Sequence, residues 1–86
     1  MPRRMVDSAL DVLNVLKAKG VPEVFEYALV IRELRAHAGG AQITINRYKV
    51  FFEEMELLQF LPKEERADMT LPVRINWAKV EKMEGV

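Results

Sequence analysis

The chain has 86 residues, half of them hydrophobic and 30% charged, a composition that indicates one small globular domain and not a disordered chain. Its 13 basic and 13 acidic side chains cancel, so no net charge draws it toward nucleic acid or a membrane. The chain has no cysteine, which excludes disulfides and thiolate chemistry.

The charge is unevenly distributed, since residues 1–49 hold eight basic and five acidic side chains and residues 50–86 hold five and eight. No stretch has the continuous apolar length of a signal peptide or a membrane span, so we expect a cytoplasmic protein. At this size a self-sufficient core is hard to complete, and a dimer or a partner subunit is an ordinary expectation.

The first expected element is an amphipathic helix over residues 6–19, because apolar residues recur there at the spacing that lines one helix face. Asp7 or Ser8 is expected to cap its start, and Gly20 to end it. The preceding residues 1–5 are expected to form a flexible arm.

A second helix is expected to start at Pro22, since proline suits the first helical position, and to run to His37. Gly39 and Gly40 are expected to end it. Its apolar residues cover most of its circumference, which predicts a central helix packed on two sides.

Residues 42–45 could form a short extended segment. Either Thr44 or Asn46 is expected to cap the third helix, which runs to Leu58. The inner face of this helix is apolar, and its outer face carries the charged residues Arg47, Lys49, Glu53, Glu54 and Glu56.

The remaining chain predicts two strands and a short helix. Residues 59–62 and the alternating residues 73–77 are read as strands, with a polar loop over residues 63–68 between them. Asn76 can cap a last helix over residues 77–83.

This order resembles a winged helix-turn-helix domain. The segment INRYKVFFEEMELLQFL is similar to a recognition helix that runs into the first wing strand, and LPVRINWAKVEKM is similar to the returning strand followed by an Asn-capped helix. The resemblance covers nearly all of residues 1–86 and reaches the superfamily only. It implies one α+β, mostly helical domain with a three-helix core, a β-hairpin wing and a short C-terminal helix.

The resemblance also implies a small DNA-binding protein, a transcriptional regulator that binds duplex DNA through the third helix and needs no cofactor. Arg47 and Lys49 at the expected helix start oppose the macrodipole, and a bound phosphate would compensate for that. The alternative is that Lys49 pairs with Glu53 at i,i+4 and that Arg47 is solvated. The expected contacts on this helix are Gln42, Thr44, Asn46, Arg47, Tyr48 and Lys49.

Two further groups of cations are expected near DNA. Arg3 and Arg4 could reach a minor groove, although a solvated terminus is the alternative. Lys63 and Arg66 stand on the expected wing among acidic residues.

A homodimer is expected through apolar residues of the first and last helices, unless these residues complete the core of the single chain. The candidates are Val12, Val15, Trp77, Val80 and Met83.

A protein-interaction module or accessory subunit with the same fold, without direct DNA contact, is the competing expectation. Its basis is the zero net charge and the acidic residues Glu53, Glu54, Glu56, Glu64, Glu65 and Asp68. An enzyme is not expected, because no catalytic or phosphate-binding motif is present and the single histidine, His37, adjoins a helix stop. No metal site is expected either.

Overall fold

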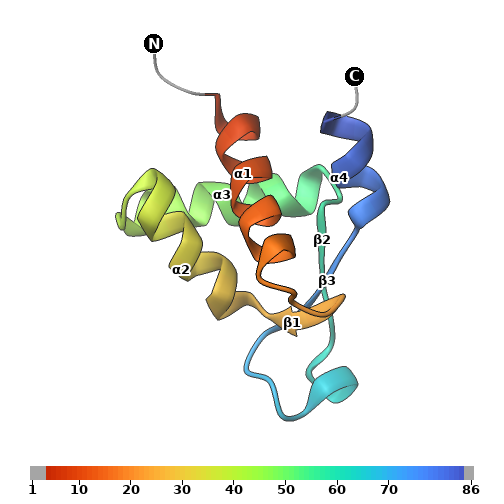
Figure 1. Ribbon diagram of the computed structural model, residues 1–86. Coiled ribbons are helices and arrows are strands. Elements are labelled where there is room, and N and C mark those ends of the chain that lie inside the picture. The colour runs from red at the N-terminus through yellow and green to blue at the C-terminus, as the bar shows by residue number, and fades with distance from the viewer. Residues whose placement is uncertain (1–3, 85–86) are drawn as a thin grey trace.

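The computed structural model describes residues 4–84 and shows an α+β fold in which a helical core carries a three-stranded antiparallel sheet (Figure 1). The predicted fold class is thereby confirmed. None of the described helices is long and apolar enough to cross a membrane. The elements in chain order are α1 (Met5–Ala18), β1 (Val24–Glu26), α2 (Tyr27–Ala38), α3 (Gln42–Glu54), β2 (Leu58–Phe60), a 3-10 turn (Lys63–Arg66), β3 (Pro72–Ile75) and α4 (Trp77–Glu84).

The sheet has the strand order β1-β3-β2, so β3 lies in the middle and pairs antiparallel with both neighbours. Phe25 of β1 and Phe60 of β2 both stand opposite Val73 of β3. The helices gather at one end of the molecule, and the loop between β2 and β3 extends at the other end (Figure 1).

Strand β1 replaces the expected first turn of the second helix, so the prediction of a helix from Pro22 is wrong. Phe25 is only 2% exposed, because the pairing of β1 with β3 places this side chain in the core. The backbone N–H of Tyr27 then donates to the carbonyl oxygen of Leu71 at 3.0 Å, and α2 begins at that residue. An aromatic beside a β-branched residue favours this extended start.

The turn between α2 and α3 has three residues, 39–41, shorter than the sequence suggests. Gly39 ends α2 with φ +90°, a conformation that favours glycine, so the predicted helix stop is confirmed. The expected extended segment 42–45 is wrong, because the N–H of Ile45 donates to the carbonyl oxygen of Ala41 at 3.1 Å within a regular helix. Burial of Ile45, which is 4% exposed, overrides the strand preference of its β-branched neighbours.

The expected caps of the first and third helices are also wrong. Helix α1 begins at Met5 and α3 at Gln42, with no side-chain cap at either start. Met5 therefore belongs to a helix and not to a flexible arm, and Asp7 lies within the first turn of α1. By contrast, the predicted Asn76 cap is confirmed, because its Oδ1 accepts a hydrogen bond from the N–H of Lys79 at 3.1 Å.

One core joins all the helices to the sheet. Helix α1 contacts α2, α3 and α4, and so occupies the centre of the helical layer. Its broad apolar surface packs against several other helices of the same chain. The fully buried side chains of this core include Leu13, Val30, Leu34, Phe52, Val73 and Val80.

Helix α3 ends at Glu54, earlier than the expected end at Leu58, in a tight hydrogen-bonded turn. The N–H of Leu57 donates back to the carbonyl oxygen of Phe52 at 3.0 Å, which returns the chain to the core. Glu56 within this turn has φ +59°, the one positive φ among the described non-glycine residues. Left-handed backbone disfavours any side chain with a Cβ, so this turn is strained.

We expect Glu56→Gly to raise the free energy of unfolding by about 0.5–1 kcal/mol, because glycine adopts a positive φ without steric cost. Glu53→Gly, inside the last turn of α3, is the matched control and should lower it by about 1 kcal/mol. Urea denaturation of both variants measures the difference. A destabilised Glu56→Gly would show that this turn carries no strain.

Tyr27 brings a polar group into the core. Its side chain is 2% exposed, its ring centroid lies 5.0 Å from that of Phe60, and its hydroxyl has no hydrogen-bond partner among the described residues. Burial, assisted by the negative charge of Glu53, raises the pKa of Tyr27 to about 12. The folded state therefore holds this proton more tightly than the unfolded chain.

This raised pKa predicts a loss of stability at high pH. An unfolded tyrosine ionises near pH 10, whereas Tyr27 stays protonated to about pH 12, so unfolding releases a proton in that window. The contribution of this group to stability is complete below pH 10 and falls by a few kcal/mol at most as the pH rises through about 12. Denaturation of Tyr27→Phe and wild type from pH 8 to 12 should show a smaller fall for the variant, and parallel curves would contradict the assignment.

Candidate nucleic-acid interface

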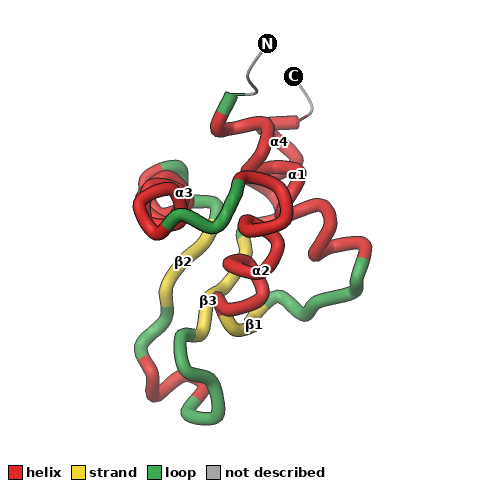
Figure 2. The backbone as a smooth tube through the Cα atoms, turned by 90° about the vertical axis from the view of Figure 1, so that its left-hand side faces the viewer, coloured by secondary structure: helices red, strands yellow, loops and turns green. Residues whose placement is uncertain are grey.

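The outer face of α3 is the main candidate surface. Helical spacing places Ile43, Asn46, Arg47 and Val50 on the side of α3 that faces away from the core, and all four are exposed. Figure 2 shows α3 and the loop of the β2–β3 hairpin on the same side of the molecule. This side could contact one extended partner through both elements.

Polar groups at the start of this face are ordered by a hydrogen bond. Gln42 Nε2 donates to Asn46 Oδ1 at 3.0 Å, one helical turn along, and both side chains are exposed. Arg47 beside them is exposed and has no ion pair within residues 4–84. Thr44 is half-buried and less accessible. The structure thus leaves two amides and a guanidinium directed at solvent.

Two expected contacts on α3 lie elsewhere. Tyr48 is 6% exposed and packs in the core, with its ring centroid 6.3 Å from that of Phe52, so its expected role at DNA is wrong. Lys49 Nζ lies 5.2 Å from the ring centroid of Phe60, which directs it toward the sheet and not along the outer face. Cation–π contact with the ring accounts for its position.

The helix-dipole argument for a phosphate at Arg47 and Lys49 does not hold, because α3 begins at Gln42 and both cations lie beyond its first turn. The start of α3 is instead uncharged and lacks a side-chain cap. Gly40, Ala41 and Gln42 are exposed there, so the free N–H groups of the first turn are open to an anion.

The expected arm and wing contribute fewer free cations than the sequence suggests. Arg4 donates from Nε to Asp7 Oδ2 at 3.2 Å, and Arg3 lies outside the described residues. Arg66 on the wing donates to Asp68 at 3.3 Å, and this hydrogen bond lowers the pKa of Asp68. Lys63 is exposed and has no ion pair in the described part of the chain.

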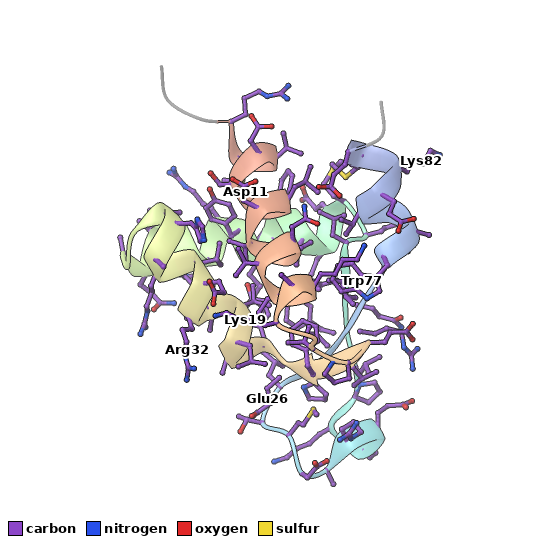
Figure 3. The ribbon with its side chains drawn as sticks, in the orientation of Figure 1. Asp11, Lys19, Glu26, Arg32, Trp77 and Lys82 are labelled. Atoms are coloured by element: carbon purple, nitrogen blue, oxygen red, sulfur yellow. The ribbon has the colours of Figure 1, made fainter. Side chains whose placement is uncertain are left out.

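Arg35 is a candidate that sequence reasoning missed. It is exposed on α2, and its stem passes beside the turn into α3, since a Cβ at Gly40 would lie 3.8 Å from Arg35 Cγ. The sequence shows only a cation on a polar helix face, and the folded turn brings it to the start of α3. Arg32, on the same helix, projects into solvent (Figure 3).

The same outer face of α3 is also apolar. Ile43 is 63% and Val50 is 52% exposed, and they are the large hydrophobic residues that the described structure leaves most open to water. Met5 of α1 and Phe51 border a shallow groove beside them. The sequence does not identify Ile43 as part of this face, because the pattern of residues 42–45 predicts an extended segment.

A second, larger cleft of about 730 Å³ lies between the end of α3, strands β2 and β3, and the start of α4. Glu23, Glu53 and Glu56 line it, and its Arg74 is paired with Glu23 at 3.4 Å. Its charge is therefore acidic. Across residues 4–84, no three His, Asp or Glu side chains gather as metal ligands would.

A smaller ionic cluster joins α1 to α2. Buried Glu33 accepts a hydrogen bond from Lys19, and its second carboxylate oxygen lies 3.9 Å from Nε2 of His37. Lys19 directly follows α1 and Glu33 lies on α2, so this contact joins the two helices, whereas His37 lies one turn from Glu33 on α2 itself.

The expected dimer residues fall into two groups. Val12 is fully buried and Val80 is 1% exposed, so both complete the core of the single chain and their assignment to an interface is wrong. Val15, Trp77 and Met83 are partly buried. Helix α4 packs on α1 of the same chain, and this intramolecular contact uses the apolar surface assigned to a second copy.

Trp77 marks this contact at the start of α4 (Figure 3). Lys17 Nζ of α1 lies 5.5 Å from its ring centroid and 3.8 Å from Glu81. Asn14 of α1 donates a hydrogen bond to Glu84 near the end of α4. The two helices are thus joined along their length.

No family model, curated protein or solved structure matches this chain, so its surface is the basis for any functional assignment.

Val80→Ala should lower the free energy of unfolding by about 2 kcal/mol, because it opens a cavity where α4 meets the core. Met83→Ala, on the partly exposed side of α4, should cost less than about 1 kcal/mol by the same reasoning. Thermal denaturation at several protein concentrations measures both. Equal costs that vary with concentration would instead place both residues in an oligomer interface.

Proposed function

We propose that this chain is a small DNA-binding protein, a transcriptional regulator that binds duplex DNA through α3. The observation that carries the proposal is the outer face of α3, where Gln42, Asn46 and Arg47 are exposed directly after a three-residue turn. The β2–β3 loop projects on the same side (Figure 2). A helix following a short turn, flanked by a hairpin, has the shape to enter a major groove while the hairpin lies beside the backbone.

The residue types on this face suit base edges. Arg47 has the fork of donors that binds guanine O6 and N7, and Asn46 has the amide that binds adenine N6 and N7. The hydrogen bond from Gln42 orients the Asn46 amide before DNA arrives, which reduces the entropy lost on binding.

Phosphate contacts would come from three places. The open start of α3 offers backbone N–H groups, Arg35 stands beside the turn, and Lys63 stands on the wing. This is a small number of cations, so electrostatic affinity should be modest. If Arg35 and Lys63 each contact one phosphate, the salt slope per copy is about −2, and a phosphate contact by Arg47 in place of a base contact would make it about −3.

A homodimer in the cytoplasm is the form proposed for this role. Two copies double the phosphate contacts, and a twofold axis matches half-sites one duplex turn apart. Val15, Trp77 and Met83 are the partly exposed residues of α1 and α4 left for such an interface.

A protein-interaction module is the second candidate, and the acidic cleft favours it. Glu23, Glu53 and Glu56 surround a cleft that also contains Trp77, and the wing carries Glu64 and Glu65. Such a surface suits a basic protein segment better than a nucleic acid, since phosphates would be repelled.

Arg47→Ala should weaken binding to duplex DNA and make the log-log salt slope shallower by about 0.9 if the guanidinium contacts a phosphate. A base contact would instead relax sequence preference with an unchanged slope. Lys49→Ala is the matched control, and it should have little effect because Lys49 lies over Phe60. Fluorescence anisotropy with duplex DNA between 50 and 200 mM salt measures affinity and slope, a range in which phosphate contacts are resolved.

The competing outcome is simple to recognise. If the wild type fails to bind DNA even at low salt, the DNA-binding role is rejected and the second candidate stands. An affinity and a salt slope that stay unchanged in Arg47→Ala would also remove the outer face of α3 from the interface.

A further inference from the structure

The exposed apolar residues of α3 have a chemical counterpart in the major groove. We propose that Ile43 and Val50 contact thymine 5-methyl groups, so that the chain selects duplex sites with thymines at defined positions. This inference rests on the proposed DNA-binding function and names the bases that α3 reads.

The first support is that these residues have no packing role. Ile43 is 63% and Val50 is 52% exposed, while the core side of the same helix is filled by Ile45 and Phe52. Together with Met5 and Phe51 they line one shallow groove. A contiguous exposed apolar patch of this kind marks contact with another molecule.

The second support is the mixture of groups on this face. Ile43, Arg47 and Val50 follow one another at helical spacing, so a guanidinium separates the two apolar side chains, and Asn46 lies beside them. A purely apolar partner would leave these polar groups unpaired. An A·T pair offers a thymine methyl beside the acceptor and donor of adenine in the same groove, which matches an amide next to an aliphatic side chain.

Charge limits how much of α3 enters the groove. Glu54 lies one turn beyond Val50 on the same face and is exposed. A carboxylate there is repelled by phosphates, so the end of α3 should point out of the groove. Contact with bases is then confined to residues 43–50, and Ile43 and Val50 mark its two ends.

The test removes the methyl groups from the DNA. Duplexes bound by the full chain are selected from a randomised pool, and thymines in the selected site are replaced one at a time by deoxyuridine, which lacks only the 5-methyl group. At one or two positions we expect affinity to fall about three- to fivefold, the effect of one buried methyl. Ile43→Ala and Val50→Ala should bind thymine and deoxyuridine duplexes equally at their own positions.

Arg47→Ala is the control variant, because it should weaken both duplexes by the same factor and keep the difference between them. Binding with sequence preference but without any deoxyuridine effect overturns this inference and leaves the proposed function intact. Variants that keep the full deoxyuridine effect also overturn it. Failure of the wild type to bind the pool overturns the proposed function and this inference together.

A second copy is the other possible occupant of the face. Sedimentation equilibrium of wild type and Ile43→Ala tests for such a dimer. If the wild type is dimeric, Ile43→Ala is monomeric and the DNA affinity is unchanged, Ile43 belongs to a self-association surface and the inference is overturned. Equal sedimentation of the two proteins, together with the deoxyuridine effect, supports thymine recognition.

Discussion

Pairing of β1 with β3 is the constraint on which the rest of the structure depends. It joins residues 24–26 to residues 72–74, so the first connection of the chain is fixed by its last strand. The pairing buries Phe25 and makes α2 start at Tyr27. With α2 beginning there and ending at Ala38, a three-residue turn suffices to lead into α3. The relative placement of α2 and α3 is therefore a consequence of the sheet as much as of the helices.

Helix α3 has one buried face and one exposed face. Ile45, Tyr48 and Phe52 bind it to the core, which fixes the rotation of the helix about its axis. That rotation leaves Asn46 and Arg47 exposed. Helix α3 and the hairpin loop lie on the same side of the molecule (Figure 2). A surface held by buried packing is preorganised, and this favours binding because little order remains to be imposed.

Local pairing of charges shapes the electrostatics of the surface. Arg4, Arg66 and Arg74 each lie within 3.4 Å of a carboxylate, and Lys49 lies over a ring. Exposed pairs of this kind contribute little to stability, but they remove cations from the field that a nucleic acid meets. The proposed interface consequently depends on a few unpaired cations and on shape and apolar contact.

Sequence periodicity alone determined the helical cores, the Asn76 cap, the Gly39 stop and the order of helices before the hairpin, because these features depend on neighbours a few residues apart. It also pointed to Asn46 and Arg47, since the polar face of an amphipathic helix is visible in the pattern. Only the tertiary structure decided that residues 24–26 form a strand, that α3 begins at Gln42, and that Tyr48, Val12 and Val80 are core. The physical reason is that strand pairing and burial depend on residues far apart in the chain, and such contacts override local propensity wherever a side chain can be removed from water.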